Sequence, residues 1–142
     1  MNIMYIKGSG GSISVHIVGY ENPRASDTDD ANWLISDIEI IAGPFSGKYR
    51  ASLATHDFSR FQTGLAGILR TFNGKAVFST YEESLHLEVE ITSRGTVTVS
   101  GEVRTHGMPK AKLSFAFETD QTLLSETLQS VSSVVQDFPV RA

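Results

Sequence analysis

Runs of alternating apolar and polar residues, separated by turn residues, are the feature that most restricts how this chain can fold. The cleanest run extends from Leu85 to Ile91, with apolar side chains at every odd position and polar ones between them. Similar runs cover 97–103 and 113–117, after turns that contain Gly95 and Gly107. A period of two is typical of a strand with one buried and one solvated face. The sequence therefore predicts an antiparallel meander in this part of the chain.

The N-terminal half shows the same period in two further hairpins. The first joins apolar runs at 3–6 and 13–17 through the turn KGSGGS, and the second joins 31–41 to 45–53 through Gly43-Pro44. Another short strand is predicted at 75–80. Together these patterns predict about seven to eight antiparallel strands.

Two segments change to a helical period, with apolar residues three and four positions apart. They predict amphipathic helices at about 56–72 and 121–138. Thr55 and Asp120 stand where an N-cap residue is expected. With a length near the usual size of one domain, residues 1–142 are expected to form a single α+β domain whose antiparallel sheet carries both helices on an apolar face.

Composition excludes several classes of function. The chain has no cysteine, so disulfides and thiolate chemistry are excluded, and no cofactor is predicted. Its net charge of −4, without a cationic block, argues against nucleic acid as a partner. No signal segment or run of about 20 apolar residues is present, so neither secretion nor a membrane partner is expected. The sequence indicates a cytoplasmic protein.

The most acidic run of the chain precedes its only tryptophan. Asp27, Asp29 and Asp30 lie among turn-forming residues, directly before Trp33 and a long strand pattern. We consider these four residues a candidate surface for a protein partner. Trp33 itself is better explained as a core or rim anchor, because tryptophan is usually largely buried.

A calcium site is the alternative interpretation of this acidic run. An EF-hand loop that began at Asp27 would need glycine at its sixth position and glutamate at its twelfth. The chain has Asn32 and Ile38 there. An irregular calcium site is not excluded by this mismatch, but a solvated acidic turn accounts for the residues and no metal site is predicted.

A second acidic group is expected on the meander. Glu88, Glu90 and Glu102 occupy polar positions of neighbouring strands, and such positions share one face of an antiparallel sheet. They form a second candidate surface for a partner. The alternative is a solvated acidic face that keeps the protein soluble.

No motif for catalysis is found. The four histidines, at positions 16, 56, 86 and 106, lack the spacing of metal ligands, and no G-x-S-x-G motif is present. No catalytic residue is therefore predicted, and the protein is expected not to be an enzyme. The alternative is a small-ligand-binding protein or hydrolase in which one histidine meets a carboxylate inside a pocket.

From about Gly19 to Pro139 the chain resembles the bacterial WapI-like immunity proteins. The resemblance rests on structural motifs, not on catalytic ones. The structural motifs are Gly19-Tyr20, Asp30-Ala31-Asn32-Trp33-Leu34, Phe45-Ser46-Gly47-Lys48-Tyr49, Thr55-His56-Asp57-Phe58, Glu82-Glu83-Ser84-Leu85, the turn at Gly95, Phe115-x-Phe117-x-Thr119-Asp120-Gln121-x-Leu123, and Phe138-Pro139.

The resemblance implies a cytoplasmic antidote that binds a cognate protein toxin made by the same cell, typically a nuclease-like module. It brings no catalytic residues with it. It implies a steric and electrostatic mechanism in which an acidic surface covers a basic nuclease site. A self-associating structural module is a third hypothesis, and a large exposed apolar patch would support it.

Overall fold

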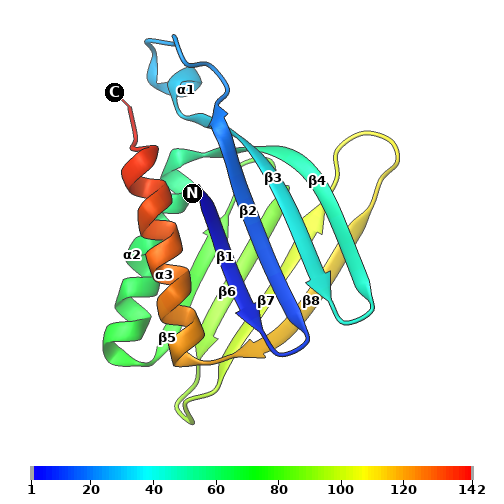
Figure 1. Cartoon of the computed structure of the whole chain (residues 1–142), viewed down its shortest axis with the longest axis vertical. Coiled ribbons are helices and arrows are strands. Elements are labelled where there is room, and N and C mark those ends of the chain that lie inside the picture. The colour runs from blue at the N-terminus through cyan, green and yellow to red at the C-terminus, as the bar shows by residue number, and fades with distance from the viewer. Residues whose placement is uncertain (1, 142) are drawn as a thin grey trace.

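The computed structural model describes residues 2–141, apart from the side chains of Thr28 and Asp29 (Figure 1). Eight strands and three helices follow one another in an order that places a 17-residue helix after each set of four strands. They are β1 (Ile3–Gly8), β2 (Gly11–Tyr20), α1 (Thr28–Ala31), β3 (Trp33–Ala42), β4 (Phe45–Ala54), α2 (Thr55–Thr71), β5 (Gly74–Ser79), β6 (Leu85–Ile91), β7 (Val97–Arg104), β8 (Lys112–Thr119) and α3 (Gln121–Asp137).

The strands form two antiparallel sheets of four, in the orders β1-β2-β3-β4 and β5-β6-β7-β8. The α+β class, the eight strands and the two long helices agree with the sequence prediction. The expectation of one sheet with helices on its apolar face was wrong. Residues of both sheets belong to one hydrophobic core, because the apolar faces of the two sheets cover each other.

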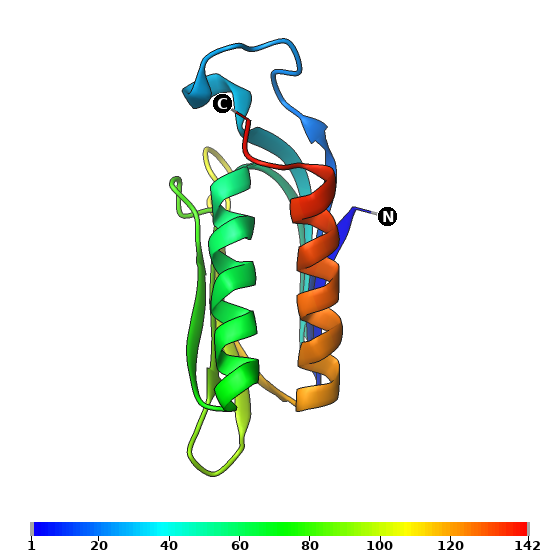
Figure 2. The ribbon, with the colours of Figure 1, turned by 90° about the vertical axis from the view of Figure 1, so that its left-hand side faces the viewer.

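The two long helices close one side of this sandwich and connect its halves. Helix α2 packs beside β5 and helix α3 beside β1, while the two helices lie against each other (Figure 2). Phe58 and Phe61 of α2 both meet Phe78 of β5 edge to face, with ring centroids 5.1 and 5.6 Å apart. Each helix thus buries its apolar stripe against the edge strand of the other half.

The helix ends differ from their sequence predictions at one point. Asp120 caps α3 as expected, since its carboxylate accepts from the Leu123 N–H at 2.8 Å. Thr55 was predicted to cap α2, but it lies inside the helix and Ala54 occupies the N-cap position. The Asp57 carboxylate, which accepts from the Ala54 N–H at 3.1 Å, supplies the missing side-chain contact.

The long connections gather at one end of the molecule, which we call the loop end (Figure 1). It comprises residues 21–32 between β2 and β3, the β5–β6 loop at 80–84, the β7–β8 loop at 105–111, and the C-terminal residues 138–141. The opposite end consists of the short β1–β2, β3–β4 and β6–β7 turns. The loop end therefore brings together residues from distant parts of the sequence.

Candidate functional site

The first candidate surface is the outer face of the β5–β8 sheet, which we call the sheet face. Glu88 and Glu90 of β6 and Glu102 of β7 all point away from the core, because every intervening residue of β6 is buried. In the β6–β7 register Glu88 lies opposite Ser100, and Glu102 lies opposite His86. The structure therefore brings the three glutamates onto one face, as the alternation predicts.

Glu88 is held by two basic neighbours on the sheet face. The Lys75 Nζ lies 3.0 Å from its Oε1, and the His86 Nε2 lies 3.0 Å from its Oε2. The hydrogen bond with His86 and, next, that with Lys75 lower the pKa of the Glu88 carboxyl. Its charge is therefore balanced within the protein.

Glu102 is paired in the same way. The Arg104 Nη2 lies 3.2 Å from its Oε1, and the Lys112 Nζ lies 3.6 Å from its Oε2. Arg104 also reaches Glu83, from the β5–β6 loop, at 3.2 Å. Basic neighbours on the same strand and on adjacent strands thus convert most of the acidic sheet face into a network of mixed charge.

The second candidate surface is the acidic run at the loop end. The Asp27 carboxylate accepts from the Asp30 N–H at 3.0 Å and so caps the four-residue helix α1. Asp30 is exposed, and its carboxylate forms no ion pair with any residue that the structure describes. The side chain of Asp29 lies outside the described part. Among the described residues, the carboxylates of Asp27 and Asp30 form no ion pair.

Arg141, which sequence reasoning did not select, fastens the acidic run to the body of the protein. Its guanidinium donates to the carbonyls of Asn22, Pro23 and Ala31, and it lies 3.8 Å from the centroid of the Tyr20 ring. Its backbone N–H donates to Asn32 Oδ1 at 2.7 Å. No motif predicts these contacts, because they join residues about as far apart in the sequence as the chain allows.

An open groove of ≈ 730 Å³ lies between the acidic run and the start of α2, and we call it the Trp33 groove. Trp33 is half-buried on one wall and meets Tyr81 edge to face, with ring centroids 6.5 Å apart. His56, Asp57 and Arg60 of α2 line the same groove. Burial raises the pKa of the Asp57 carboxyl. Trp33 is therefore a rim anchor that still reaches the surface.

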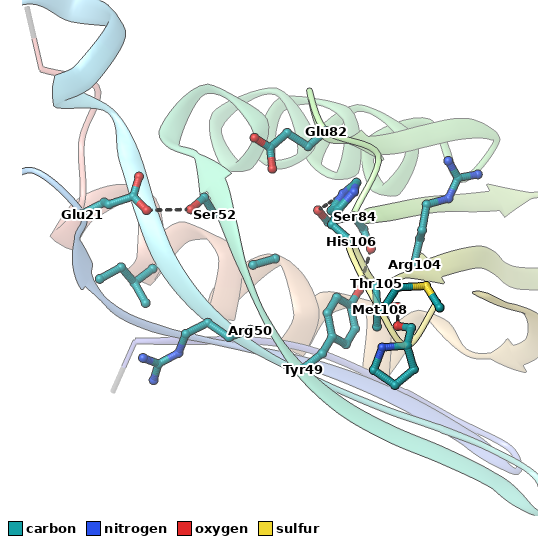
Figure 3. Close-up of a pocket in the computed structure, with 13 residues that line it drawn as sticks. Glu21, Tyr49, Arg50, Ser52, Glu82, Ser84, Arg104, Thr105, His106 and Met108 are labelled. Atoms are coloured by element: carbon teal, nitrogen blue, oxygen red, sulfur yellow. Dashed lines mark hydrogen bonds between the residues drawn. The ribbon is translucent and has the colours of Figure 1, made fainter. Parts of the chain in front are cut away.

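A second hollow of ≈ 580 Å³, the Tyr49 pocket, opens between β4 and the β5–β6 and β7–β8 loops (Figure 3). The Tyr49 hydroxyl donates to the Ser84 carbonyl at 2.6 Å, and the His106 Nε2 lies 3.1 Å from the Ser84 Oγ. Burial raises the pKa of Tyr49, so the phenol keeps the proton that it donates. These bonds tie an edge strand of one sheet to loops of the other.

The four histidines occupy four separate places. His16 is exposed on the outer face of the first sheet, and His56 lines the Trp33 groove. His86 pairs with Glu88, and His106 contacts Ser84. Among the side chains that the structure describes, no three His, Asp or Glu residues converge as metal ligands.

A family model matches the chain over residues 4–139, and its description is the immunity protein WapI-like family. The chain belongs to the WapI-like immunity protein family. No curated protein matches it in sequence. Of the solved structures, that of the plant transcriptional regulator PBF-2 is similar over 94% of this chain and 79% of that one, with 12% identity and a TM-score of 0.49.

Membership of the WapI-like family gives the two candidate surfaces a context. The family suggests a role in neutralising a toxin, and immunity proteins are typically non-enzymatic. In the part of the chain that the structure covers, no helix is long and apolar enough to cross a membrane.

Proposed function

We propose that this immunity protein, acting as a single domain, neutralises a cognate toxin by binding it and covering its active site with the acidic loop end. The family match over residues 4–139 supports the class of function. The choice of the loop end rests on charge, since Asp30 is exposed and carries no ion pair among the described residues. The main carboxylates of the sheet face, Glu88 and Glu102, are already paired.

The toxin domain that we propose is nuclease-like. A nuclease binds phosphates through lysine and arginine side chains, so its active site is strongly basic. An acidic partner surface complements such a site and accelerates the encounter of the two proteins. The net charge of −4 and the acidic run at 27–30 fit this partner. The proposal places the protein in the cytoplasm of the toxin-producing cell, and neither nucleic acid nor a membrane takes part.

Co-expression with the cognate toxin domain tests the proposal. Cells that produce both proteins are expected to grow, whereas cells that produce the toxin alone stop growing. The purified proteins are expected to form a stable complex in which nucleic-acid cleavage is suppressed. A toxin that stays active beside an excess of folded immunity protein would contradict the function. Suppression of a toxin that cleaves no nucleic acid would contradict only the nuclease class.

A hydrolase is the second candidate function, and the contact between His106 and Ser84 in the Tyr49 pocket is the observation that favours it. A base within hydrogen-bond reach of a serine hydroxyl is the first requirement of an activated nucleophile. However, Ser84 is only 1% exposed, and no carboxylate hydrogen-bonds to His106 among the described residues. Ester hydrolysis that is abolished by Ser84→Ala would support this function, and its absence at high protein concentration would exclude it.

A further inference from the structure

The Tyr49 pocket lies on the side of the sandwich that the helices leave open. Helices α2 and α3 pack beside β5 and β1, whereas the pocket is lined by β4, at the opposite edge of the first sheet (Figure 1). Its remaining walls are the β5–β6 and β7–β8 loops, together with Glu21, Ile35 of β3 and Arg104 of β7. The hydrogen bond from Tyr49 to the Ser84 carbonyl fixes the distance between these walls. The pocket is therefore a preformed feature of the loop end.

The two arginines that line the pocket are already neutralised. Arg50 forms a bidentate pair with Asp37, with N–O distances of 2.8 and 3.1 Å, and Figure 3 shows its guanidinium directed away from the pocket. Arg104 is shared between Glu83 and Glu102, at 3.2 Å from each. Neither guanidinium is available to attract an anion into the pocket.

The two carboxylates at the rim, unlike the arginines, form no ion pair with the described residues. Glu82 forms no hydrogen bond or ion pair with the described residues, and Glu21 contacts only the Ser52 hydroxyl, at 2.8 Å. Figure 3 shows both carboxylates on the same side of the opening. The charge left unbalanced at the pocket is therefore negative. A cationic group that entered here would meet two carboxylates, with the Tyr49 ring nearby.

One highly exposed apolar side chain lines the pocket, and another follows on the β5–β6 loop. Tyr81, next to Glu82, and Met108, on the β7–β8 loop, are each 86% exposed, more than any other large apolar residue of the described chain. Tyr81 also forms a wall of the Trp33 groove, so the β5–β6 loop separates the two hollows. Aromatic residues and methionine are enriched in the centres of protein interfaces. Such side chains in and next to a charged pocket suit a protein partner more than a small ligand.

We propose that the toxin inserts an arginine or lysine side chain into the Tyr49 pocket, between Glu21 and Glu82, while Tyr81 and Met108 cover apolar surface on the same partner. This inference rests on the proposed function and adds the anchor of the complex to it. The inserted cation replaces its hydration with two carboxylates, and the flanking side chains exclude water around them. A contact of this kind dominates the dissociation rate of a complex.

Binding of the cognate toxin domain to the double variant Glu21→Gln, Glu82→Gln tests the inference. Each glutamine keeps the size of the side chain and, at position 21, an oxygen for the Ser52 hydroxyl. We expect the dissociation constant to rise by about tenfold to a hundredfold, mostly through faster dissociation. The matched control is Glu90→Gln, which removes an exposed carboxylate on the sheet face and is expected to change affinity less than about twofold.

A second set of variants, with its own control, tests the exposed apolar side chains. We expect Tyr81→Ala and Met108→Ala each to weaken binding by about fivefold or more. Phe45→Ala is the control, because Phe45 is 63% exposed in the β3–β4 turn at the opposite end of the molecule. Thermal unfolding of all variants is compared with that of the wild type, and these surface changes are expected to leave it nearly unchanged.

A charge exchange identifies the inserted residue. The variant Glu82→Lys is expected to lose binding, and one arginine or lysine to glutamate change in the toxin is expected to restore it. If the double variant binds as tightly as Glu90→Gln, the pocket is not the anchor, although the proposed function stands. If the wild-type protein itself does not bind the toxin, the proposed function fails and the inference fails with it.

Discussion

The sheet face and the loop end are both acidic in sequence, yet the fold treats their carboxylates differently. On the sheet face Glu88 and Glu102 each have two basic neighbours within 3.6 Å. At the loop end Asp30 and Glu82 have no ion-pair partner among the described residues. Apart from the exposed Glu90, the first surface is an internally balanced network, and the second keeps its charge available to another molecule.

The difference follows from how each surface is built. In a sheet, side chains two residues apart on one strand share a face, and strand register places those of neighbouring strands about 5 Å apart. A glutamate on the sheet face therefore acquires basic partners from its own strand and from the adjacent one. A loop has no such register, and its carboxylates face water unless the chain brings a cation to them. Acidity counted along the sequence is therefore a poor guide to a binding surface, whereas unpaired acidity in the structure is a better one.

The largest expected difference between the two surfaces is in how strongly a glycine-to-alanine change near each one destabilises the fold. A Cβ added at Gly101, under the sheet face, would lie 2.4 Å from the His86 carbonyl oxygen, whereas one at Gly19, near the loop end, would meet nothing within 4 Å. We expect Gly101→Ala to lower the free energy of unfolding by about 1–3 kcal/mol. Gly19→Ala is expected to change it by less than about 0.5 kcal/mol. Urea unfolding measures both, and equal losses would contradict the contrast.

The order of the loop end is expected to depend on Arg141. Removing its guanidinium in Arg141→Ala leaves the carbonyls of Asn22, Pro23 and Ala31 without this donor. We expect stability to fall by about 1–2 kcal/mol and amide hydrogen exchange to accelerate in residues 22–32 and not on the sheet face. Arg94→Ala, in the β6–β7 turn, is the control. An unchanged rate of amide exchange in residues 22–32 would show that the loop is ordered without the Arg141 hydrogen bonds.

Matched charge reversals on the two surfaces test their roles in association. Asp30 and Glu90 are both exposed, so Asp30→Lys and Glu90→Lys change the net charge equally. We expect Asp30→Lys to slow association with the toxin on the order of three- to tenfold at low salt, and Glu90→Lys to slow it less than about twofold. Stopped-flow measurements at two salt concentrations separate the effects. A larger effect of Glu90→Lys would assign the contact to the sheet face.

The smallest expected effect is the contribution of the Glu88 ion pairs on the sheet face to stability. The pKa of Glu88 is lowered in the folded protein, so its pairing stabilises the fold above the ordinary carboxyl value of 4.5. This stabilisation is lost as the pH falls through the lower folded value. The wild type is expected to exceed Glu88→Gln in stability at pH 7 by less than about 1 kcal/mol. Denaturant titrations should show the difference disappearing in acid, and a constant difference would point to packing instead.

Local patterns were sufficient to predict most of the secondary structure. Strands and helices have different periods, and each period is visible in a few consecutive residues such as those from Leu85 to Ile91. The same logic placed Glu88, Glu90 and Glu102 on one face correctly. It misplaced the α2 cap, because the helix begins at Thr55 itself and Asp57 stabilises this end by accepting from the Ala54 N–H.

Packing reasons inferred from single residues were only partly right. Helix α2 contains two glycines, and a glycine inside a helix favours close packing on a neighbouring element. A Cβ at Gly64 would lie 3.1 Å from the Ala76 Cβ, which confirms the expectation there, whereas one at Gly67 would meet nothing within 4 Å. A glycine in the sequence shows where close contact is possible, and only the neighbouring element decides whether it occurs.

The sequence by itself determined the α+β class, the elements, the family and the acidic character of the chain. Tertiary structure alone decided that the strands divide into two sheets, that cations balance the sheet face, and that Arg141 fastens the acidic run. It also placed both Glu21 and Glu82 at the Tyr49 pocket. The physical reason is that periodicity shows which side of a strand or helix is buried. Which residues pack against that side, or pair with its charges, depends on contacts between residues far apart in the chain.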